Sequence, residues 1–545
     1  MQYLLTIVAA TSISLAIIPL MVRLAPALGM MDKPSKRKVH QIPIARVGGW
    51  GIVLGALVPV TVLLPDERVF HAYILGALVL AVFGTWDDRK ELGHYVKFIG
   101  QFIAIVPLVT YGDLYVTSLP LFGLDTLPKS VAIPFTVFAM MGVINALNHS
   151  DGLDGLAAGE SLLSLSAITF LSFQSGAFFA TIIAAATIGG ALGFLRYNTH
   201  PAAVFMGDGG SQFLGYTLGF LVILLTQEVD TTLSSAMVLL LLGLPIIDIL
   251  VVLKKRILQG KNWFRASRNH VHHRLLELGF VHQESVVIIY TVQTLFVLAA
   301  VVLRYENDWM IVAIYGLVCA LLFVPLNIAE KTGWKIYKAT DQGVFVQALS
   351  YARHKFLVIV PRRFLDIVIP GYLIIGSIIA VKVPRDFGLA AAAVFVFLLI
   401  EPFFNKTTRS IVRRALIYLV AAFIIYLHFD YPQLVYPWIR PVRFAFFLMI
   451  AVSVAVAVRF SPRRRKFEFQ TTAMDFLMVF MVFAALGYST FQHHETWIGI
   501  FVIKLVVILY ACELSIIERR ERWTPLTISS LVAVATLSFR GLVLG

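Results

Sequence analysis

The sequence predicts an all-α integral membrane protein, a polytopic helical bundle of about eighteen transmembrane helices. Of its 545 residues, 59% are hydrophobic and only 14% are charged, and the mean hydropathy is +0.83. Soluble domains carry about 25% charged residues. Apolar runs long enough to cross a bilayer recur along the whole chain. These observations exclude a soluble protein, a disordered chain and a disulfide scaffold.

The first apolar run, residues 2–22, has no basic residue before it and no clear small-residue cleavage site. We therefore expect a retained first span and not a cleaved signal peptide. Apolar runs place the centres of the following spans near residues 56, 77, 104, 139, 167, 186, 219, 244, 294, 319, 374, 396, 421, 450, 480, 504 and 533.

Basic residues predict the orientation of these spans. The net charge is +14, and most of the 45 lysines and arginines fall in alternate loops, including 23–47, 254–284 and 329–364. The positive-inside rule assigns such loops to the cytoplasm. Basic residues that alternate with long apolar runs fit a lipid bilayer as the partner, and we expect no nucleic-acid partner.

Composition divides the chain into two membrane domains. Residues 1–330, with about 11 spans, have cytoplasmic loops rich in Asp, Asn, His and Gly. Residues 331–364 form a basic cytoplasmic linker. Residues 365–545, with about seven spans, have loops that are merely basic. For this second domain, a transporter and a partner-binding module both remain open.

The first polar motif, TWDDRKELGHYVKF, places adjacent carboxylates, Asp87 and Asp88, at the end of the third expected span. Such a pair can hold a divalent cation or act as a base. Lys97 in the same motif could hold a lipid phosphate. Taken alone, the motif could also be an ordinary polar helix end.

The second motif, NALNHSDGLDGLAAG, repeats a polar side chain every three residues, at Asn145, Asn148, Asp151 and Asp154. On a helix this spacing forms a stripe on roughly one face. Four oxygen-bearing side chains in one stripe suit a hard cation and a polar ligand.

The third motif, RYNTHPAAVFMGDGGSQFLG, places Asp208 among glycines at the expected start of a helix. Glycines allow the backbone to approach a phosphate closely, a helix N-terminus attracts anions, and the carboxylate can hold a metal. Asn198 and Phe205 precede it, and a ring beside an amide could hold a nucleobase.

The fourth motif, FRASRNHVHHRLLELGF, groups His270, His272 and His273 with arginines that include Arg274. Guanidinium groups beside imidazoles suit a diphosphate and sugar oxygens. Zinc binding and a surface basic patch are the alternatives, although zinc ligands usually have other spacings.

The fifth motif, MDKPSKRKVHQIPIARVGG, is by itself a positive-inside anchor. Beside the other four motifs, Asp32, His40 and Arg46 become candidate contacts to a substrate.

In their order along residues 1–330, these motifs resemble those of the polyprenyl-phosphate N-acetylhexosamine-1-phosphate transferase superfamily, glycosyltransferase family 4. The resemblance implies transfer of a sugar-1-phosphate from a UDP-sugar to undecaprenyl phosphate, with release of UMP. It implies a bacterial inner membrane, an active site facing the cytoplasm, Mg²⁺ or Mn²⁺ as the cofactor, and a homodimer. Residues 365–545 lie beyond the usual family length.

The last motif resembles the branch that uses UDP-GlcNAc to start a cell-surface polysaccharide. The peptidoglycan branch, which uses UDP-MurNAc-pentapeptide, usually has three successive histidines followed by Phe, whereas this chain has HHRL. That branch and a multi-pass transporter are the alternative functions. A transporter would keep its polar groups near the bilayer midplane, whereas here they cluster in loops at one face.

The resemblance also implies roles for individual residues. Asp208 would be the main metal ligand with Asn148 nearby, and Asp87 and Asp88 would sit near the acceptor phosphate. Asp151 joins these two carboxylates as a candidate catalytic group. Substrate-binding roles fall to the uracil contacts Asp154, Asn198 and Phe205, and to the diphosphate and sugar contacts His270, His272, His273 and Arg274. We expect one direct displacement, with a covalent intermediate on an aspartate as the alternative.

Overall fold

A computed structural model describes residues 2–32, 43–118, 126–260, 269–335, 360–380, 382–403, 406–430, 439–459, 504–512, 514–515 and 525–543. The predicted helical class is confirmed, because nearly all regular structure in these ranges is α-helix. Ten of the described helices are long and apolar enough to cross a membrane, and three more apolar helices are shorter. The expected number of about eighteen spans is not confirmed.

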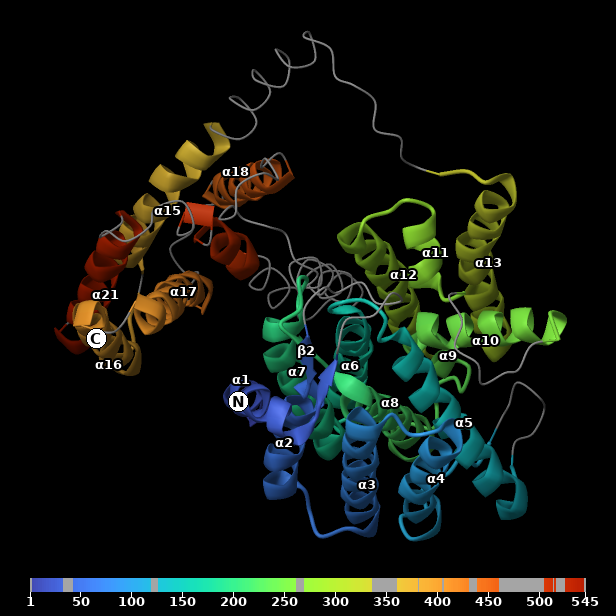
Figure 1. The fold of residues 1–545 in the computed structure, drawn as a ribbon. Coiled ribbons are helices and arrows are strands. Elements are labelled where there is room, and N and C mark those ends of the chain that lie inside the picture. Colours follow the sequence, from blue (N-terminus) through green and yellow to red (C-terminus); the bar gives the residue numbers. More distant parts are fainter. Residues whose placement is uncertain are drawn as a thin grey trace. The chain divides into compact units, whose positions relative to one another are not determined.

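The described residues form two compact units, one up to residue 335 and one from residue 360 onward. Figure 1 shows the elements of both. The elements of the first unit are α1 (Gln2–Leu28), β1 (Met31–Asp32), β2 (Ile44–Arg46), α2 (Gly48–Leu63), α3 (Arg68–Lys90), α4 (His94–Thr110), α5 (Lys129–Ser150), α6 (Leu156–Gln174), α7 (Phe178–Asn198), β3 (Val204–Phe205), α8 (Gly207–Leu224), the π-helical turn η2 (Leu225–Val229), α9 (Met237–Leu241), α10 (Gly243–Leu258), α11 (Val271–Glu277), α12 (His282–Val302) and α13 (Asp308–Thr332).

Helix α8 is the centre of the first unit. It packs against α2, α3, α5, α6 and α7, and it is buried along nearly its whole length. Small residues permit this close packing: the backbone of Gly84 in α3 lies directly against that of Gly209 in α8, with no room for a side chain between them. The N-terminus of α8 is thereby fixed beside the C-terminus of α3.

A small three-stranded sheet, which the sequence did not reveal, holds the loops beside the start of α8. Strand β2 pairs antiparallel with β1 and parallel with β3. In this way the segment after α1 is tied to the segment before α8, although the two are far apart in the sequence. The strands are too short for a periodic signal to identify them.

The second unit contains α15 (Val360–Ile379), α16 (Arg385–Ile400), the 3-10 turn η4 (Glu401–Phe403), α17 (Lys406–Asp430), α18 (Ile439–Arg459) and α21 (Pro525–Val543). It has an apolar core of its own. Helices α16 and α21 approach closely where Gly388 meets Gly541. Its one fully buried acid, Glu401, is paired with Arg413 at 2.7 Å, so within the described residues the charge in this core is neutralised internally.

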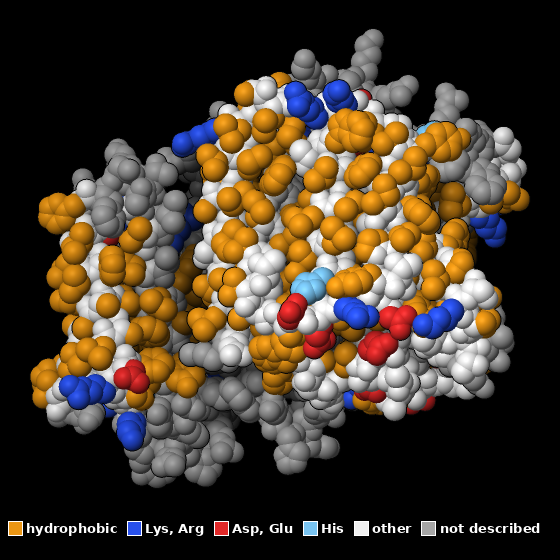
Figure 2. Space-filling model, turned by 90° about the horizontal axis from the view of Figure 1, so that it is seen from below, with side chains coloured by type: hydrophobic (Ala, Val, Ile, Leu, Met, Phe, Trp, Pro, Cys, Tyr) orange, Lys and Arg blue, Asp and Glu red, His pale blue; other side chains and the backbone are white. Residues whose placement is uncertain are grey.

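The surface of the protein is that of a membrane protein. Hydrophobic side chains cover most of the face drawn in Figure 2, and the charged side chains gather toward its upper and lower margins. Many of the exposed large hydrophobic residues lie on helices that are long enough to span a bilayer. Together with the ten candidate spans, this distribution makes the chain a multi-pass membrane protein.

Candidate active site

Three carboxylates and one lysine meet where α3, α4 and α8 come together. Asp87 and Asp88 lie in the last turn of α3, Asp208 lies in the first turn of α8, and Lys97 lies in the first turn of α4. The Lys97 Nζ atom is 2.8 Å from Asp87 Oδ2 and 2.5 Å from Asp208 Oδ2. We call these four residues the carboxylate cluster. Two motifs that are separated by more than a hundred residues therefore share one site.

The two adjacent aspartates have different neighbours. Asp88 accepts hydrogen bonds from the backbone N–H groups of Asp208, at 2.9 Å, and Gly209, at 3.3 Å. It therefore satisfies free donors at the N-terminus of α8 and fixes where that helix begins. Gly207 has a φ of +74° and lies against the Asp88 carboxylate, so a larger residue would disturb this contact. Asp87 faces Lys97 and Asp208.

Helix α5 brings the second motif to the same place. The Asn148 amide lies beside Asp208 and donates to Ser211 Oγ at 2.8 Å. The expected polar stripe is interrupted, because α5 ends at Ser150 and the chain then turns. Asp151 lies in this turn, where burial and the nearby charges of Asp208 and Asp154 raise its pKa to about 7.

Asp154 and Asn198 are engaged by protein groups in this structure. Asp154 Oδ2 lies 2.7 Å from His200 Nδ1 and accepts the Ala202 N–H at 3.1 Å. Burial alone would raise the pKa of Asp154, but these hydrogen bonds outweigh it and hold the pKa below its ordinary value. Asn198 is buried; it accepts the Gly155 N–H and donates to the Val204 carbonyl, both at 2.8 Å. Its amide thus ties the 151–155 turn to β3.

Asp154, His200 and His282 also form a group that could hold a metal. One ligand atom from each lies within 4.8 Å of the others. The two imidazole rings stack with their centroids 4.0 Å apart. Because ring stacking and hydrogen bonds already account for this arrangement, the carboxylate cluster is the better candidate for a magnesium site.

The histidine motif closes the site from the side of α10 and α11. His270 Nδ1 lies 2.8 Å from Asp248 Oδ2, and the other Asp248 oxygen accepts the Val271 N–H at 2.8 Å. The His149 ring, one residue after Asn148, stacks on His270 with the ring centroids 5.2 Å apart. We call His270, His272, Arg274 and Asp248 the histidine cluster. Its contact with His149 places it beside the carboxylate cluster.

His272 also lies against the 151–155 turn. A side chain at Gly152 would collide with the His272 imidazole, so the second and fourth motifs touch directly. Burial, and then the neighbouring histidines, hold the pKa of His272 well below its ordinary value. The ring is therefore neutral at physiological pH and can accept or donate one hydrogen bond. His273, which is less buried, follows it at the start of α11.

Arg274 is held away from the carboxylate cluster in the described structure, and its predicted role in holding the diphosphate and sugar stays a prediction. Its side chain is 1% exposed and is paired with Glu330 through Nε. It also donates to Asn327 Oδ1 at 2.7 Å. Arg274 therefore joins α11 to α13, and its guanidinium does not face the carboxylate cluster.

The fifth motif lies at the edge of the site. Arg46 in β2 is paired with the buried Asp32 and is 3.6 Å from Glu91. Phe205 lies in β3, beside Arg46 across the parallel pair. His40 lies outside the described residues, so its predicted contact stays a prediction.

Sequence reasoning missed Asp248, Ser211 and Glu330. Asp248 is a single acid in the apolar run GLPIIDILVV, and an intramembrane acid is by itself a signal of function. Ser211 belongs to the third motif but was not given a role. Glu330 carried no signal, because its partner Arg274 lies more than fifty residues away.

Comparison with known proteins supports this assembly of motifs. Residues 70–226 match the model of glycosyl transferase family 4. The chain is 34% identical over 325 residues to a protein of Bacillus subtilis (strain 168) named as a probable undecaprenyl-phosphate N-acetylglucosaminyl 1-phosphate transferase, covering 58% of this chain and 89% of that one.

Two further relatives have names of the same kind. The undecaprenyl-phosphate alpha-N-acetylglucosaminyl 1-phosphate transferase of Escherichia coli (strain K12) is 29% identical, with 58% of this chain and 87% of that one covered. The decaprenyl-phosphate N-acetylglucosaminephosphotransferase of Mycobacterium leprae (strain TN) is 31% identical, with 56% and 80% covered. The chain therefore belongs to glycosyl transferase family 4, the family of the polyprenyl-phosphate N-acetylhexosamine-1-phosphate transferases.

Proposed function

We propose that this protein transfers N-acetylglucosamine-1-phosphate from its UDP-sugar to undecaprenyl phosphate and releases UMP. The observation that carries the proposal is the carboxylate cluster, in which Asp87 and Asp208 converge on one point from two distant motifs. The names of the relatives support the polyprenyl-phosphate acceptor and the N-acetylglucosamine-1-phosphate group. The UDP donor comes from the family resemblance.

The donor set of the carboxylate cluster fits a magnesium ion. Two of its three aspartates share one lysine, and the Lys97 ammonium already occupies a cation position between Asp87 and Asp208. Carboxylate oxygens are the ligands that Mg²⁺ prefers. Asp208 and Asp87 would hold the ion, with Asn148 beside them, and the bound ion would neutralise charge on the leaving phosphate.

The reaction forms one P–O bond and breaks another. An oxygen of the lipid phosphate attacks the sugar-bearing phosphorus of the donor, and the bridging oxygen leaves with UMP. A phosphate monoester is an adequate nucleophile near pH 7, so the protein mainly positions the reactants and balances charge. Lys97, which the described structure holds between two carboxylates, would lie within reach of an incoming phosphate. We favour direct displacement over a covalent intermediate.

The remaining polar groups would orient the donor. The neutral His272 imidazole, which lies beside Gly152, and the His270 ring, which Asp248 holds in place, present hydrogen-bonding groups next to the carboxylate cluster. The N-terminus of α8, where Asp88 already accepts the Asp208 and Gly209 N–H groups, contributes the positive end of a helix dipole near a phosphate. Asp151, at the same turn, would accept or direct a proton.

The test is an assay of the purified full chain with undecaprenyl phosphate and radiolabelled UDP-sugars, with and without Mg²⁺. We expect label from UDP-GlcNAc in the lipid fraction and UMP as the second product, only when Mg²⁺ is present. A panel of UDP-sugars that includes UDP-MurNAc-pentapeptide identifies which donor the protein uses. Lipid product from that donor alone would overturn the choice of sugar, and no lipid product from any donor would overturn the reaction.

We further propose that the reaction takes place at the cytoplasmic face of a bacterial inner membrane and begins a cell-surface polysaccharide. Positive-inside loops support the orientation. We assign the activity to residues 1–330, because every motif residue lies there and so does the family match at residues 70–226. A chain ending at residue 340 should keep transfer activity within about twofold, because residues 365–545 supply no motif side chain. A homodimer stays a prediction.

A further inference from the structure

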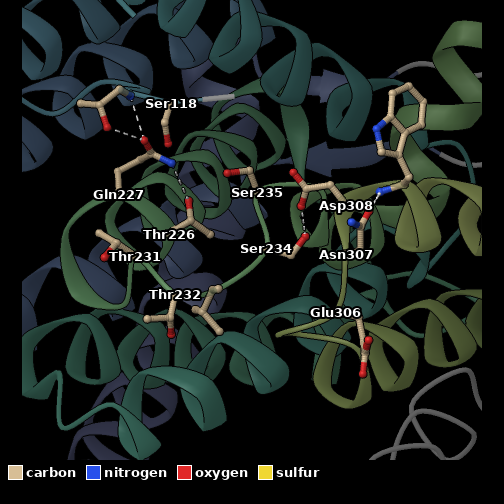
Figure 3. A pocket seen from close by; sticks show the side chains of 13 residues that line it. Ser118, Thr226, Gln227, Thr231, Thr232, Ser234, Ser235, Glu306, Asn307 and Asp308 are labelled. Atoms are coloured by element: carbon tan, nitrogen blue, oxygen red, sulfur yellow. Dashed lines mark hydrogen bonds between the residues drawn. The ribbon is translucent and has the colours of Figure 1, made fainter. Parts of the chain in front are cut away.

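A second polar cavity lies at the far end of α8 from Asp208. Its volume is about 340 Å³, and Figure 3 shows the side chains that line it. They come from the segment after α4, from η2, from the loop that follows η2, and from the N-terminal end of α13 with the residues just before it. Because α8 has 18 residues, it separates the cavity from the carboxylate cluster by roughly 27 Å. The cavity is therefore distinct from the candidate active site and opens toward the opposite membrane face.

The lining of the cavity restricts the chemistry of its ligand. Of the thirteen lining residues, all but Leu233 and Trp309 are polar. Two carboxylates, Glu306 and Asp308, are among them, and no lysine or arginine is. A phosphate or another anion would meet uncompensated negative charge, and a lipid tail would meet hydroxyl groups. A neutral polar ligand or a cation remains, and the many hydroxyl and amide groups of the lining favour the neutral ligand.

Only one of the two carboxylate oxygens of Asp308 has a hydrogen-bond partner among the described residues. Asp308 Oδ1 accepts hydrogen bonds from the Ser234 hydroxyl and from the Ala236 N–H. The other oxygen, Oδ2, is buried and has no hydrogen-bond partner among the described residues. Figure 3 shows Asp308 next to Ser234 and Asn307 at the cavity. A buried carboxylate oxygen without a donor is costly, so a ligand that brings hydroxyl groups would relieve that cost.

The opposite wall of the cavity is held rigidly. Gln227 Oε1 accepts both the backbone N–H of Thr117, at 2.8 Å, and its hydroxyl, at 2.9 Å. Gln227 lies in the π-helical turn η2, a feature that occurs frequently at functional sites. This wall of the cavity is thus a fixed frame, whereas Thr231, Thr232 and Glu306 on the rim are exposed.

We propose that this cavity binds a neutral carbohydrate of one or two sugar rings. Hydroxyl and amide side chains match sugar hydroxyls as both donors and acceptors, and a small rotation of the Asp308 side chain would bring Oδ2, which is buried here, to a sugar hydroxyl. Trp309, which is 63% exposed, offers an apolar face on which the C–H face of a sugar can stack. The volume lies at the lower end of the range for small-molecule sites, about 300–1,000 Å³. The proposal does not depend on the transferase activity.

The test uses the purified full chain in lipid nanodiscs and saturation-transfer NMR. The probes are N-acetylglucosamine and its β-1,4-linked disaccharide, with glucuronate as the anionic counterpart. We expect binding of the neutral sugars and at least about tenfold weaker binding of them by Trp309→Ala. Trp334→Ala is the matched control, because Trp334 is 56% exposed just beyond the other end of α13.

The same experiment separates the cavity from the active site and from a cation site. Asp208→Asn should bind the neutral sugars as the unmodified chain does, since Asp208 lies at the far end of α8. Absence of sugar binding, equal binding by Trp309→Ala, or loss of binding in Asp208→Asn would each overturn the proposal. Calcium binding without sugar binding, measured by isothermal titration, would do the same and would assign the two carboxylates to a cation.

Discussion

The carboxylate cluster and the histidine cluster lie side by side but balance their charges differently. In the first, Asp87 and Asp208 share the single ammonium of Lys97, and Asp88 lies beside them against the backbone N–H groups of Asp208 and Gly209. In the second, Asp248 pairs with His270, and Glu330 pairs with Arg274. The carboxylate cluster is therefore left with excess negative charge that a cation can satisfy, whereas the acids of the histidine cluster already have partners and hold its side chains in place.

The difference indicates which residues of the site take part in the chemistry and which position other groups. Carboxylates that repel one another destabilise the fold unless a cation or a substrate binds to them. A role in catalysis therefore explains why these carboxylates are grouped. Side chains that are paired with one another keep a fixed geometry. A role in positioning the substrate-binding groups therefore explains the second cluster. Substitutions in the first cluster should therefore reduce activity and leave stability intact, and those among the paired acids of the second should affect orientation or stability.

The largest effect is expected from Asp208→Asn. Loss of this carboxylate should reduce lipid-product formation by at least about a hundredfold, because charge stabilisation at the reacting phosphate is lost. The thermal midpoint should fall only slightly, because Lys97 loses one charged partner but keeps Asp87. Asp113→Asn, an exposed aspartate paired with Lys129, is the matched control. Activity close to that of the unmodified chain would contradict the assignment of Asp208.

Asp248→Asn should have an intermediate effect. The His270 ring would lose the acceptor that fixes its orientation, and losses of this kind are typically about tenfold to a hundredfold. We expect the change to appear mainly in the KM for the UDP-sugar, since His270 is assigned to donor binding. Steady-state kinetics with each substrate varied separately measure this change. A change confined to the KM of the lipid would mean that His270 binds the acceptor and not the donor.

Glu330→Gln should affect stability and not chemistry. Arg274 is buried and would keep only Asn327 as a full partner, at a cost of about 1–3 kcal/mol. We expect a lower thermal midpoint with unchanged turnover of the folded protein. Glu277→Gln, an exposed acid on the same helix as Arg274, should change neither quantity. A loss of turnover without a lower thermal midpoint would mean that Arg274 acts in the active site.

The smallest expected effect is a pH dependence due to Asp151. Its pKa of about 7 means that the carboxyl is mostly protonated below pH 7 and mostly charged above it. If the charged form directs the proton, activity rises with pH through this range, by about tenfold per unit on the acidic side. Asp151→Asn should flatten this limb of the pH–rate profile. A limb that persists in Asp151→Asn belongs to another group.

The sequence was sufficient for features that repeat or that carry chemistry locally. Apolar runs predicted the helical membrane class, which the described helices confirm. The residue types of the motifs predicted that Asp87, Asn148 and Asp208 belong together, and the structure places them together. Polar groups next to lipid are costly, so their presence in so apolar a chain is informative.

Features that depend on long-range pairing could not be predicted. Arg274 had the composition of a phosphate ligand, and only the approach of α13 shows that Glu330 and Asn327 occupy it. Asn198 was expected to bind a base, but both ends of its amide are used by the backbone. The number of about eighteen spans stays a prediction, because some of the expected spans, such as that near residue 480, lie outside the described residues.

The most direct test of the account is a titration of the purified full chain with Mn²⁺, followed by electron paramagnetic resonance. The excess negative charge of the carboxylate cluster predicts one site that Asp208→Asn weakens by about tenfold or more, while Asp113→Asn leaves it unchanged. Equal Mn²⁺ binding by the unmodified chain and Asp208→Asn would contradict the account, because the three converging aspartates would then not be the place where the cation is held.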